Sequence, residues 1–287
     1  MRIAYCNGGL GNQVFQYIFS RYIEIQTGET VYLDDSFFYT MPQHNGLEMF
    51  NVFPNAKAHL LSDVFSEDVW KYILENRTQP QNICQQLKDS GEDIMLIAET
   101  ENFSFNGNTV FVPTNQFFPA MSVTRGNIYY HGYWLNKDWL LPEVKQELQF
   151  VEIDDERNKR YEEQIEQSNS VALHIRRGDF VSLGYDAKVD SYALAVRELK
   201  KRLSELKFFI FSDDLKWCHD DIDAMGLKAD EVVFVEGNTG VSSFRDMQLM
   251  SYCKNACLVS TSSFSYLAYV LNRNDTVGVL NMTSRVV

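Results

Sequence analysis

The chain has 287 residues, 39 of them acidic and 26 basic, so its formal net charge is −13 at pH 7. This balance argues against a nucleic-acid partner, because even the most basic stretch, Arg197–Lys207, interleaves its cations with glutamates. An apolar content of 45% predicts a globular chain rather than a disordered one, and the length predicts about two domains. Any anionic ligand must therefore be held by a few local cations.

No basic segment followed by a long apolar core begins the chain, and no apolar run approaches the ~18 residues of a membrane span. We therefore expect neither a secretory signal nor a transmembrane segment, and a protein that is cytoplasmic or peripheral to the inner membrane. An odd, scattered set of cysteines is typical of reduced thiols rather than of a disulfide framework. The five are Cys6, Cys84, Cys218, Cys253 and Cys257.

The first segments of the chain predict a βαβ unit. We expect a strand over Arg2–Asn7, a glycine turn over Gly8–Asn12, an amphipathic helix over Gln13–Thr27 and a second strand over Val31–Leu33. The glycine turn lies where the first helix starts, which is where sheets of this kind bind ligands. From residue 36 to 125 the apolar residues follow no regular period, and the pattern predicts no topology there.

Strands and helices alternate regularly after the acidic segment Glu152–Asn169, which indicates a domain boundary near residue 150. The alternation predicts a doubly wound α/β domain, and two α/β halves imply a cleft between them. The expected strands are Val171–Ile175, Phe208–Phe211, Val232–Val235, Cys257–Val259 and Val277–Leu280. The expected helices are one that Asp190 caps and that continues through Leu206, a short one near Leu215, Ser242–Tyr252 and Ser263–Leu271.

The segment His174–Asp179 directly follows a predicted strand and contains a histidine, two arginines and a carboxylate. Polar residues at the carboxyl end of such a strand are typical of a ligand site. Arg176 and Arg177 could make bidentate, charge-assisted hydrogen bonds to phosphate oxygens. The alternative is a salt-bridged strand end in which Asp179 is only a structural partner.

The turn Gly8–Gln13 would let backbone N–H groups approach a ligand, because glycine has no Cβ. It is not the dinucleotide-binding fingerprint, since Val14 stands where that pattern needs glycine. A simple tight turn between strand and helix is the alternative.

Two more predicted strands end in polar residues. Ser260–Ser265 could cap the following helix or bind an oxyanion. In Phe211–Asp214 one carboxylate could cap a helix and the other could accept hydrogen bonds from N1 and N2 of guanine. Together with the glycine turn and the His174 segment, four strand ends are expected to converge on one crevice.

Other patterns favour structural roles. Asp221–Asp223 has the D-x-D spacing of some metal-dependent sugar transferases, but a solvated helix face is the simpler interpretation. Cys218–His219 and the pair Cys253 and Cys257 do not supply a zinc site, and no G-x-S-x-G nucleophile motif is present. His131–Trp134 could stack on a sugar ring, although aromatic core packing is the safer interpretation.

Taken together, these segments resemble the motifs of bacterial α-1,2-fucosyltransferases. The matches lie in order along nearly the whole chain, so the combination is far more specific than one glycine loop. They are Gly8–Tyr17, Gly132–Trp134, His174–Phe180, Ser262–Ser265 and Leu271–Asn272.

The resemblance implies an α/β GT-B glycosyltransferase with two Rossmann-like domains facing a cleft. Residues 1–150 would mainly bind the acceptor and residues 151–287 the donor, GDP-fucose. It further implies an inverting, metal-independent transfer of L-fucose to the 2-hydroxyl of a glycan acceptor, such as a galactose-terminated or lipid-linked one, without a cofactor.

The same resemblance assigns roles to individual residues. His174 would contact guanine, Arg176 the diphosphate and fucose, and Asp213 guanine. The phosphates would lie against Ser262, Ser263 and Phe264. The other implied donor-binding positions are Gly9, Gly11, Asn12 and Arg177.

Inversion requires the acceptor hydroxyl to lose its proton, which makes Asp179 the first candidate for the base and Asp186 the second. The catalytic set expected from the sequence is thus His174, Arg176 and Asp179. One rival is a GDP-sugar transferase that makes another linkage. Another is a non-catalytic nucleotide- or carbohydrate-binding protein of the same fold.

Overall fold

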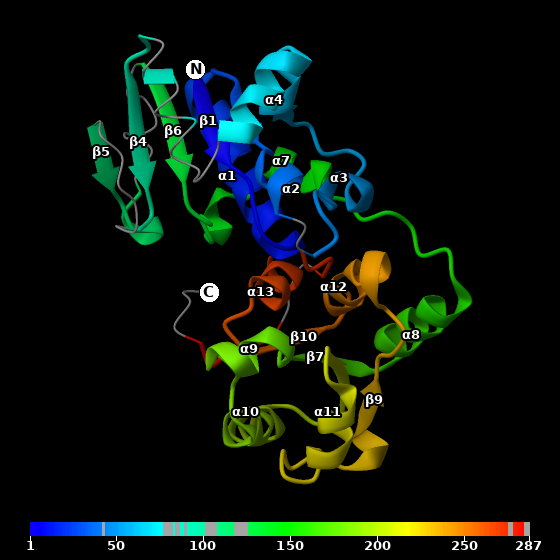
Figure 1. Ribbon diagram of the computed structural model, residues 1–287. Helices are drawn as coiled ribbons and strands as arrows, with labels where there is room; N and C mark the ends of the chain where they lie inside the picture. The colour runs from blue at the N-terminus through cyan, green and yellow to red at the C-terminus, as the bar shows by residue number, and fades with distance from the viewer. Residues whose placement is uncertain are drawn as a thin grey trace. The chain divides into compact units, whose positions relative to one another are not determined.

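The computed structural model describes residues 1–41, 44–76, 83, 87–88, 91–100, 108–117, 126–274 and 278–283. Cys84 and Val277, which figure in the expectations above, lie outside these ranges. The chain divides into two compact units, which we call the N-terminal unit, Met1–Gln149, and the C-terminal unit, Phe150–Val287 (Figure 1). Each unit is described by itself.

The N-terminal unit is built on a parallel sheet with the strand order β3-β2-β1-β6-β4-β5. The expected βαβ unit is confirmed, because β1 and β2 pair in parallel on either side of the first helix. The segment for which the pattern predicted no topology supplies β3, β4 and β5. The strands are β1 Arg2–Tyr5, β2 Val31–Asp34, β3 His59–Leu60, β4 Ile94–Ala98, β5 Asn108–Phe111 and β6 Asn127–His131.

Helix α1, Leu10–Thr27, begins three residues before the expected start at Gln13. Gly9 is its N-cap, and the carbonyl of Gly9 accepts hydrogen bonds from the N–H groups of Asn12 and Gln13 at 2.9 and 3.1 Å. Gly11 and Asn12 therefore belong to the first helical turn rather than to the glycine turn. As expected, Gly28 closes the helix in the left-handed conformation, with φ of 69°.

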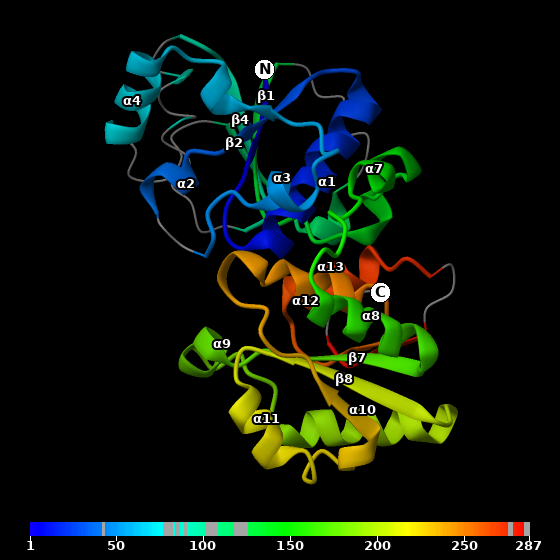
Figure 2. The ribbon, with the colours of Figure 1, turned by 90° about the vertical axis from the view of Figure 1, so that its right-hand side faces the viewer.

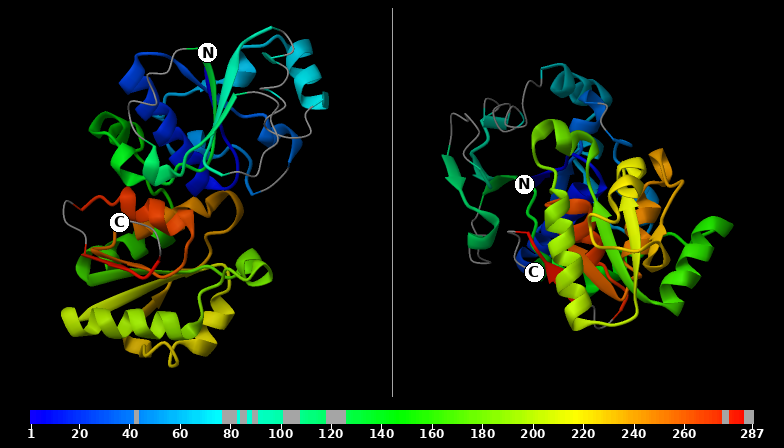
Figure 3. Two further views of the ribbon diagram at one scale, coloured as in Figure 1. Left: turned by 90° about the vertical axis from the view of Figure 1, so that its left-hand side faces the viewer. Right: turned by 90° about the horizontal axis from the view of Figure 1, so that it is seen from below.

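Helices α1 and α4, Glu67–Asn76, cover opposite faces of this sheet (Figures 2 and 3). On the α1 face, Phe19 stacks on Trp134 with ring centroids 4.4 Å apart. Trp134 is fully buried, so the core-packing interpretation holds for this ring, whereas Tyr133 beside it is 44% exposed. Among the described residues of this unit, the other α-helices are α2 Phe37–Thr40, α3 Met49–Val52 and α7 Pro142–Glu147.

The C-terminal unit contains a second parallel sheet, with the order β11-β10-β7-β8-β9. Its strands are β7 Asn169–Ile175, β8 Leu206–Ser212, β9 Val232–Phe234, β10 Asn255–Leu258 and β11 Gly278–Asn281. Its helices are α8 Glu156–Gln167, α9 Gly178–Leu183, α10 Val189–Arg202, α11 Leu215–Asp221, α12 Phe244–Met250 and α13 Ser263–Val270. The regular alternation read from the sequence is confirmed.

Two expected helices of the C-terminal unit had wrong ends. Lys188, not Asp190, is the N-cap of α10, and this helix ends at Arg202 because Leu206 already pairs in β8. Helix α12 begins at Phe244, since a short 3-10 turn occupies Gly240–Ser242.

Helices α10 and α11 cover one face of the second sheet, and α8, α12 and α13 cover the other (Figure 2). The α10 face is apolar, with Tyr192, Val196 and Leu199 packed on Val171, Leu173 and Phe208. The apolar side chains of α10 repeat with the 3.6-residue period of a helix, and those of β7 alternate along the strand. Each element therefore has one apolar face, and the two faces pack together.

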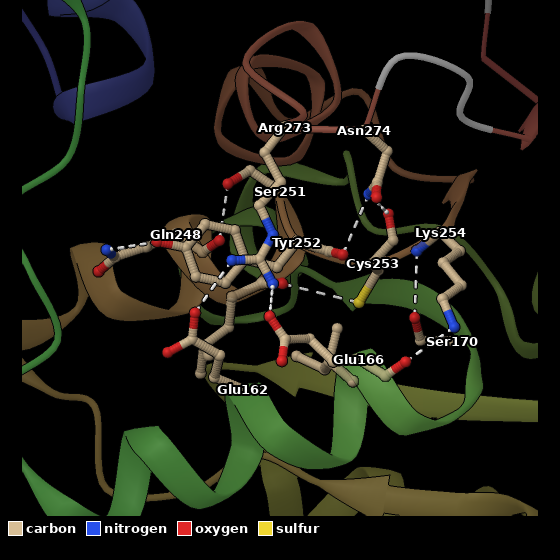
Figure 4. A network of polar contacts seen from close by, with 12 residues as sticks. Glu162, Glu166, Ser170, Gln248, Ser251, Tyr252, Cys253, Lys254, Arg273 and Asn274 are labelled. Carbon is tan, nitrogen blue, oxygen red and sulfur yellow. Dashed lines mark hydrogen bonds and ion pairs between the residues drawn. The ribbon is translucent and has the colours of Figure 1, made fainter.

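On the opposite face Arg273 ties α8 to the segment that follows α12 (Figure 4). Its guanidinium donates to Glu162 at 2.9 Å and to Glu166 at 2.7 Å, and its Cζ lies 3.6 Å from the ring centroid of Tyr252. Lys254 donates to the carbonyls of Glu166 and Ser168, so it holds the carboxyl end of α8. These contacts fix the helix layer over the sheet.

We expect Arg273→Lys to lower the free energy of unfolding by about 1 kcal/mol, because an ammonium group cannot bridge both glutamates and stack on Tyr252 at once. Arg160→Lys, an exposed position on the same helix α8, is the matched control. Urea denaturation measures both. Equal stabilities of the two variants would show that the Arg273 contacts contribute nothing.

Candidate functional site

The carboxyl edge of the second sheet brings three of the predicted strand ends together. Strand β7 lies between β10 and β8, and Ile175 pairs with Ser212 in register. Arg176 and Asp213 directly follow these two paired residues, so they lie side by side at the ends of neighbouring strands. The serine segment follows β10, the other neighbour of β7. The fourth predicted strand end, the glycine turn, belongs to the N-terminal unit.

Arg176 is held by two carboxylates. Its Nη1 donates to Oδ2 of Asp213 at 2.6 Å and its Nη2 donates to Oδ1 of Asp179 at 2.6 Å. Cζ lies 5.5 Å from the centroid of the Phe180 ring, and the side chain remains 28% exposed. A guanidinium has further N–H groups on Nε and on both Nη atoms, so the oriented side chain can still donate to an anion.

Arg177 is engaged more fully. Its Nε donates to Asp214 at 3.2 Å, its Cζ lies 4.1 Å from the centroid of the Trp217 ring, and its Nη1 lies 3.9 Å from Oδ2 of Asp186. The other oxygen of Asp214 accepts the N–H of Trp217 and so caps α11, as one carboxylate of this segment was expected to do. This arrangement fits the salt-bridged strand end, and a donor-binding role of Arg177 stays a prediction.

His174 is buried at the end of β7, with its ring centroid 5.6 Å from that of Phe264. Burial and the nearby charge of Arg176 lower the pKa of His174 to about 3, so the imidazole is neutral at physiological pH. Its Nδ1 is buried without a hydrogen-bond partner among the described residues. Buried polar atoms are nearly always paired, so this nitrogen requires a partner other than the described residues, such as a water or a ligand.

The serine segment forms the beginning of α13. The hydroxyl of Ser262 accepts the N–H of Phe264 at 3.3 Å, and the N–H of Ser262 donates to the hydroxyl of Ser260 at 3.1 Å. The capping role is thus observed. Ser263 and Phe264 are half-buried at the positive end of the helix dipole, where an anion is favoured.

The two candidate bases differ in access. The side chain of Asp179 is 51% exposed, whereas that of Asp186 is 8% exposed. Asp186 is also paired with Lys188 at 3.1 Å. Asp179 is therefore the one that an acceptor hydroxyl can reach more easily.

Sequence reasoning missed Asp246, a carboxyl in the first turn of α12. Its Oδ1 accepts from Nδ2 of Asn238 at 2.8 Å, and Asn238 exchanges two hydrogen bonds of 2.9 Å with Asn158. Burial raises the pKa of Asp246 to about 7. The acidic residue at the start of a helix and the nearby Asn238 were the available signals, but Asn158 lies 80 residues before Asn238 in the sequence.

In the N-terminal unit the two glycines of the turn have different roles. Gly8 has φ of 77°, and a Cβ there would lie 2.7 Å from Nδ2 of Asn12. Gly9 has φ of −76°, and a Cβ there would lie 3.6 Å from the ring of His44, an ordinary contact. Gly8 is therefore required by the backbone, whereas Gly9 is not. Gly11 is buried and Asn12 is half-buried.

Two fully buried glutamines of α1 fix the loops around this turn. Nε2 of Gln13 donates to the carbonyls of Gly8 and Gly46 at 2.9 and 2.8 Å. Nε2 of Gln16 donates to Asn7 and to the carbonyl of Gly132 at 2.7 and 3.1 Å. Two other chain segments, at Gly46 and at Gly132, are thereby held beside the glycine turn.

The model of the family described as "Glycosyl transferase family 11" matches residues 3–285. The chain belongs to glycosyl transferase family 11. The resemblance read from the motifs is thus confirmed.

Two Escherichia coli relatives of this family 11 chain span nearly all of it. An α-1,2-colitosyltransferase is 29% identical over 95% of this chain and 88% of its own length. The O-antigen biosynthesis glycosyltransferase WbnK is 24% identical over 93% of this chain and 88% of its own length. A galactoside 2-α-L-fucosyltransferase, Sec1 of Mus musculus, is 30% identical over 40% of this chain and 32% of its own.

Solved structures resemble the fold of the family 11 chain. Fucosyltransferase NodZ from Bradyrhizobium matches with a TM-score of 0.50 at 16% identity, covering 94% of this chain and 92% of that one. A crystal of NodZ α-1,6-fucosyltransferase soaked with GDP-fucose matches with a TM-score of 0.52 at the same coverage. The expected GT-B fold, with two parallel-sheet α/β units, is confirmed.

The cysteines, the Asp221–Asp223 segment, metal ligands and membrane-spanning helices are the remaining features for which the sequence of this family 11 chain gave an expectation. Cys6, Cys218, Cys253 and Cys257 are free and buried. Asp221 ends α11 and Asp223 is exposed in the turn beyond it. Within the described ranges, no three His, Cys, Asp or Glu side chains are grouped as metal ligands. No helix among those residues is both long and apolar enough to cross a membrane.

We expect the stability of the family 11 protein to depend on Asp246 over a defined pH window. Between the ordinary pKa of 3.8 and about 7, the folded protein keeps a proton that the unfolded chain has released, so stability falls as pH rises through this window. Asn does not titrate, so Asp246→Asn should not show this loss of stability. The stability of the variant relative to the parent should therefore increase from about pH 5 to about pH 8. Urea unfolding at both values tests this, and a constant difference would contradict it.

The two glycines of the turn should respond differently to alanine. Gly8→Ala should lower the free energy of unfolding by about 1–2 kcal/mol, because a side chain is strained at positive φ. Gly9→Ala should leave stability unchanged within about 0.5 kcal/mol, because an added Cβ would meet the His44 ring only at an ordinary contact distance. It should lower turnover, because Gly9 is a predicted ligand-binding position. Thermal unfolding and an activity assay measure both properties. Full activity in Gly9→Ala would show that no ligand needs this space.

Proposed function

We propose that the protein is an inverting glycosyltransferase that moves L-fucose from GDP-β-L-fucose to the 2-hydroxyl of a galactose-terminated glycan. The observation that carries this proposal is the oriented Arg176, a partly exposed cation that follows the central strand of the second sheet in a chain of net charge −13. Membership of family 11 and the name of the murine relative, a galactoside 2-α-L-fucosyltransferase, support the choice of sugar and linkage.

Bond cleavage at C1 of the donor leaves its charge on the diphosphate of GDP. Arg176 and the first N–H groups of α13 can donate hydrogen bonds to the diphosphate oxygens, so the chain's own residues can stabilise the leaving group. We therefore propose that transfer needs neither a metal ion nor a cofactor. The neutral His174, with its unpaired Nδ1, would offer a hydrogen bond rather than a charge to the donor.

The acceptor hydroxyl must lose its proton as the new bond forms. Asp179 is the exposed carboxylate beside Arg176, so we assign it the role of the base. Asp186 is enclosed by its ion pairs and is the poorer choice.

We assign the acceptor to the N-terminal unit and the donor to the C-terminal one. In the N-terminal unit, Gln13 and Gln16 stiffen the loops beside Gly9, which is the preorganisation that a sugar site requires. Tyr133 presents a half-exposed ring that can stack on the apolar face of a galactose ring. His44, exposed with φ of 53°, presents ring nitrogens for hydroxyl groups. The name of WbnK favours a glycan of the O-antigen type, which is lipid-linked while it is assembled.

A second donor deserves the same assay because one full-length relative is named a colitosyltransferase. Colitose is 3-deoxy-L-fucose, so the two donors differ only in one hydroxyl. A site that hydrogen-bonds the 3-hydroxyl would discriminate strongly against the deoxy sugar, and an apolar site would not.

The test uses GDP-fucose and GDP-colitose with β-galactoside acceptors in the presence of EDTA. We expect GDP release and a glycan whose new α-1,2 linkage is identified by NMR. Transfer only of colitose would replace the first donor by the second. GDP binding with neither transfer nor donor hydrolysis would support the non-catalytic rival, and an absolute metal requirement would refute the metal-free mechanism.

In this assay Arg176→Ala should lower kcat about 10²–10³-fold, because the lost donor acts most strongly in the transition state. Arg176→Lys should recover only part of the loss, since an ammonium lacks the planar fork. Arg160→Ala is the control with the same change of charge, and circular dichroism checks the fold. Near-normal turnover of Arg176→Ala would remove the basis of the proposal.

A further inference from the structure

The carboxylate of Asp213 is already used on both oxygens by the segment after β7. Its Oδ2 accepts Nη1 of Arg176 at 2.6 Å, and its Oδ1 accepts the backbone N–H of Arg177 at 2.8 Å. The side chain is 27% exposed. One carboxylate thus fixes both the guanidinium of Arg176 and the backbone that carries it.

The end of β8 is itself anchored to β7. The hydroxyl of Ser212 donates to the carbonyl of Ile175 at 2.7 Å and accepts the N–H of Asp214 at 3.0 Å. Asp213 lies between these two anchors, so its position relative to Arg176 is set by the sheet register and not by a flexible loop.

Gly178 leaves the space that the carboxylate occupies. A Cβ at this position would lie 2.5 Å from Oδ2 of Asp213, closer than real Cβ contacts. The glycine of the His174–Asp179 segment is therefore explained by the approach of Asp213, without a left-handed backbone.

A guanine base presents N1–H and N2–H side by side, and an aspartate that recognises it must offer both oxygens in that direction. In Asp213 both oxygens are directed at the arginine pair. We propose that Asp213 is a positioning residue, which orients Arg176 toward the diphosphate of the donor, rather than a contact of the guanine base. This inference rests on the proposed function of the site.

The orientation follows from the two ion pairs of Arg176. Asp213 binds Nη1 and Asp179 binds Nη2, so rotation of the guanidinium about its long axis is restrained from two sides. If the Asp213 pair is removed, only the half-exposed Asp179 remains, and Arg176 can swing into solvent. The diphosphate would then lose a preorganised donor, whatever base the nucleotide carries.

The experiment separates the phosphate end of the nucleotide from the base. Isothermal titration calorimetry measures binding of GDP and IDP to the whole protein, because IDP lacks only the 2-amino group of guanine. We expect Asp213→Ala to weaken the binding of both nucleotides by the same factor, about tenfold. The ratio of the affinities for GDP and IDP should then stay as it is in the parent protein. With the accepted sugar donor, kcat should fall by more than KM rises.

Two further variants guard against a merely structural effect. Gly178→Ala keeps the carboxylate but displaces it from Arg176, and it should reproduce the loss with an unchanged ratio. Asp213→Asn keeps an oxygen for the N–H of Arg177 and should recover part of kcat. Asp220→Ala, which breaks an exposed ion pair on α11, is the control and should match the parent.

If the ratio of the affinities for GDP and IDP falls to about one in Asp213→Ala, the inference is overturned, because Asp213 would then contact the guanine base. Unchanged binding and turnover in this variant would also overturn it. A parent protein that neither binds GDP nor transfers a sugar would instead refute the proposed function, so the two failures are distinguishable.

Discussion

The site depends on a cation held between carboxylates at the end of a buried strand. Arg176 follows β7, the central strand of the second sheet, and its guanidinium is fixed by Asp213 from the neighbouring strand and by Asp179 from its own segment. The carboxylates fix the direction of the arginine without using all of its N–H groups. Because the side chain remains partly exposed, it can meet an anion without first being ordered.

Outside the Arg176 cluster, buried polar side chains fix loop segments of both units by hydrogen bonds. In the N-terminal unit Gln13 and Gln16 hold the loops beside Gly9. In the C-terminal unit Asn158 and Asn238 hold the loop after β9. Such buried networks stabilise one arrangement of loops because each unmade hydrogen bond would leave a desolvated polar atom.

Much of the architecture could be predicted from local patterns. The βαβ start, the alternation after residue 150 and the fold class follow from apolar periodicity, which reports which faces of helices and strands are buried. The ends of α1, α10 and α12 could not, because they depend on caps and on where the next strand begins to pair. Strand β3 is only two residues long and β5 is largely exposed, so neither produces a clear apolar pattern. The parallel sheet that includes them is therefore visible only in the structure.

By itself, the sequence determined that two adjacent arginines stand beside a histidine after a buried strand of an acidic chain, and that the chain resembles fucosyltransferases. Strand order and register then decided which residues each of these side chains contacts. They separated Arg176, which is held between Asp179 and Asp213 and partly exposed, from Arg177, which is paired with Asp214 and stacked on Trp217. They also brought Asp213 onto Arg176, although 36 residues separate the two along the chain. Contacts between segments so distant in sequence arise from the pairing of strands, and the apolar pattern of one strand does not say which other strand it pairs with.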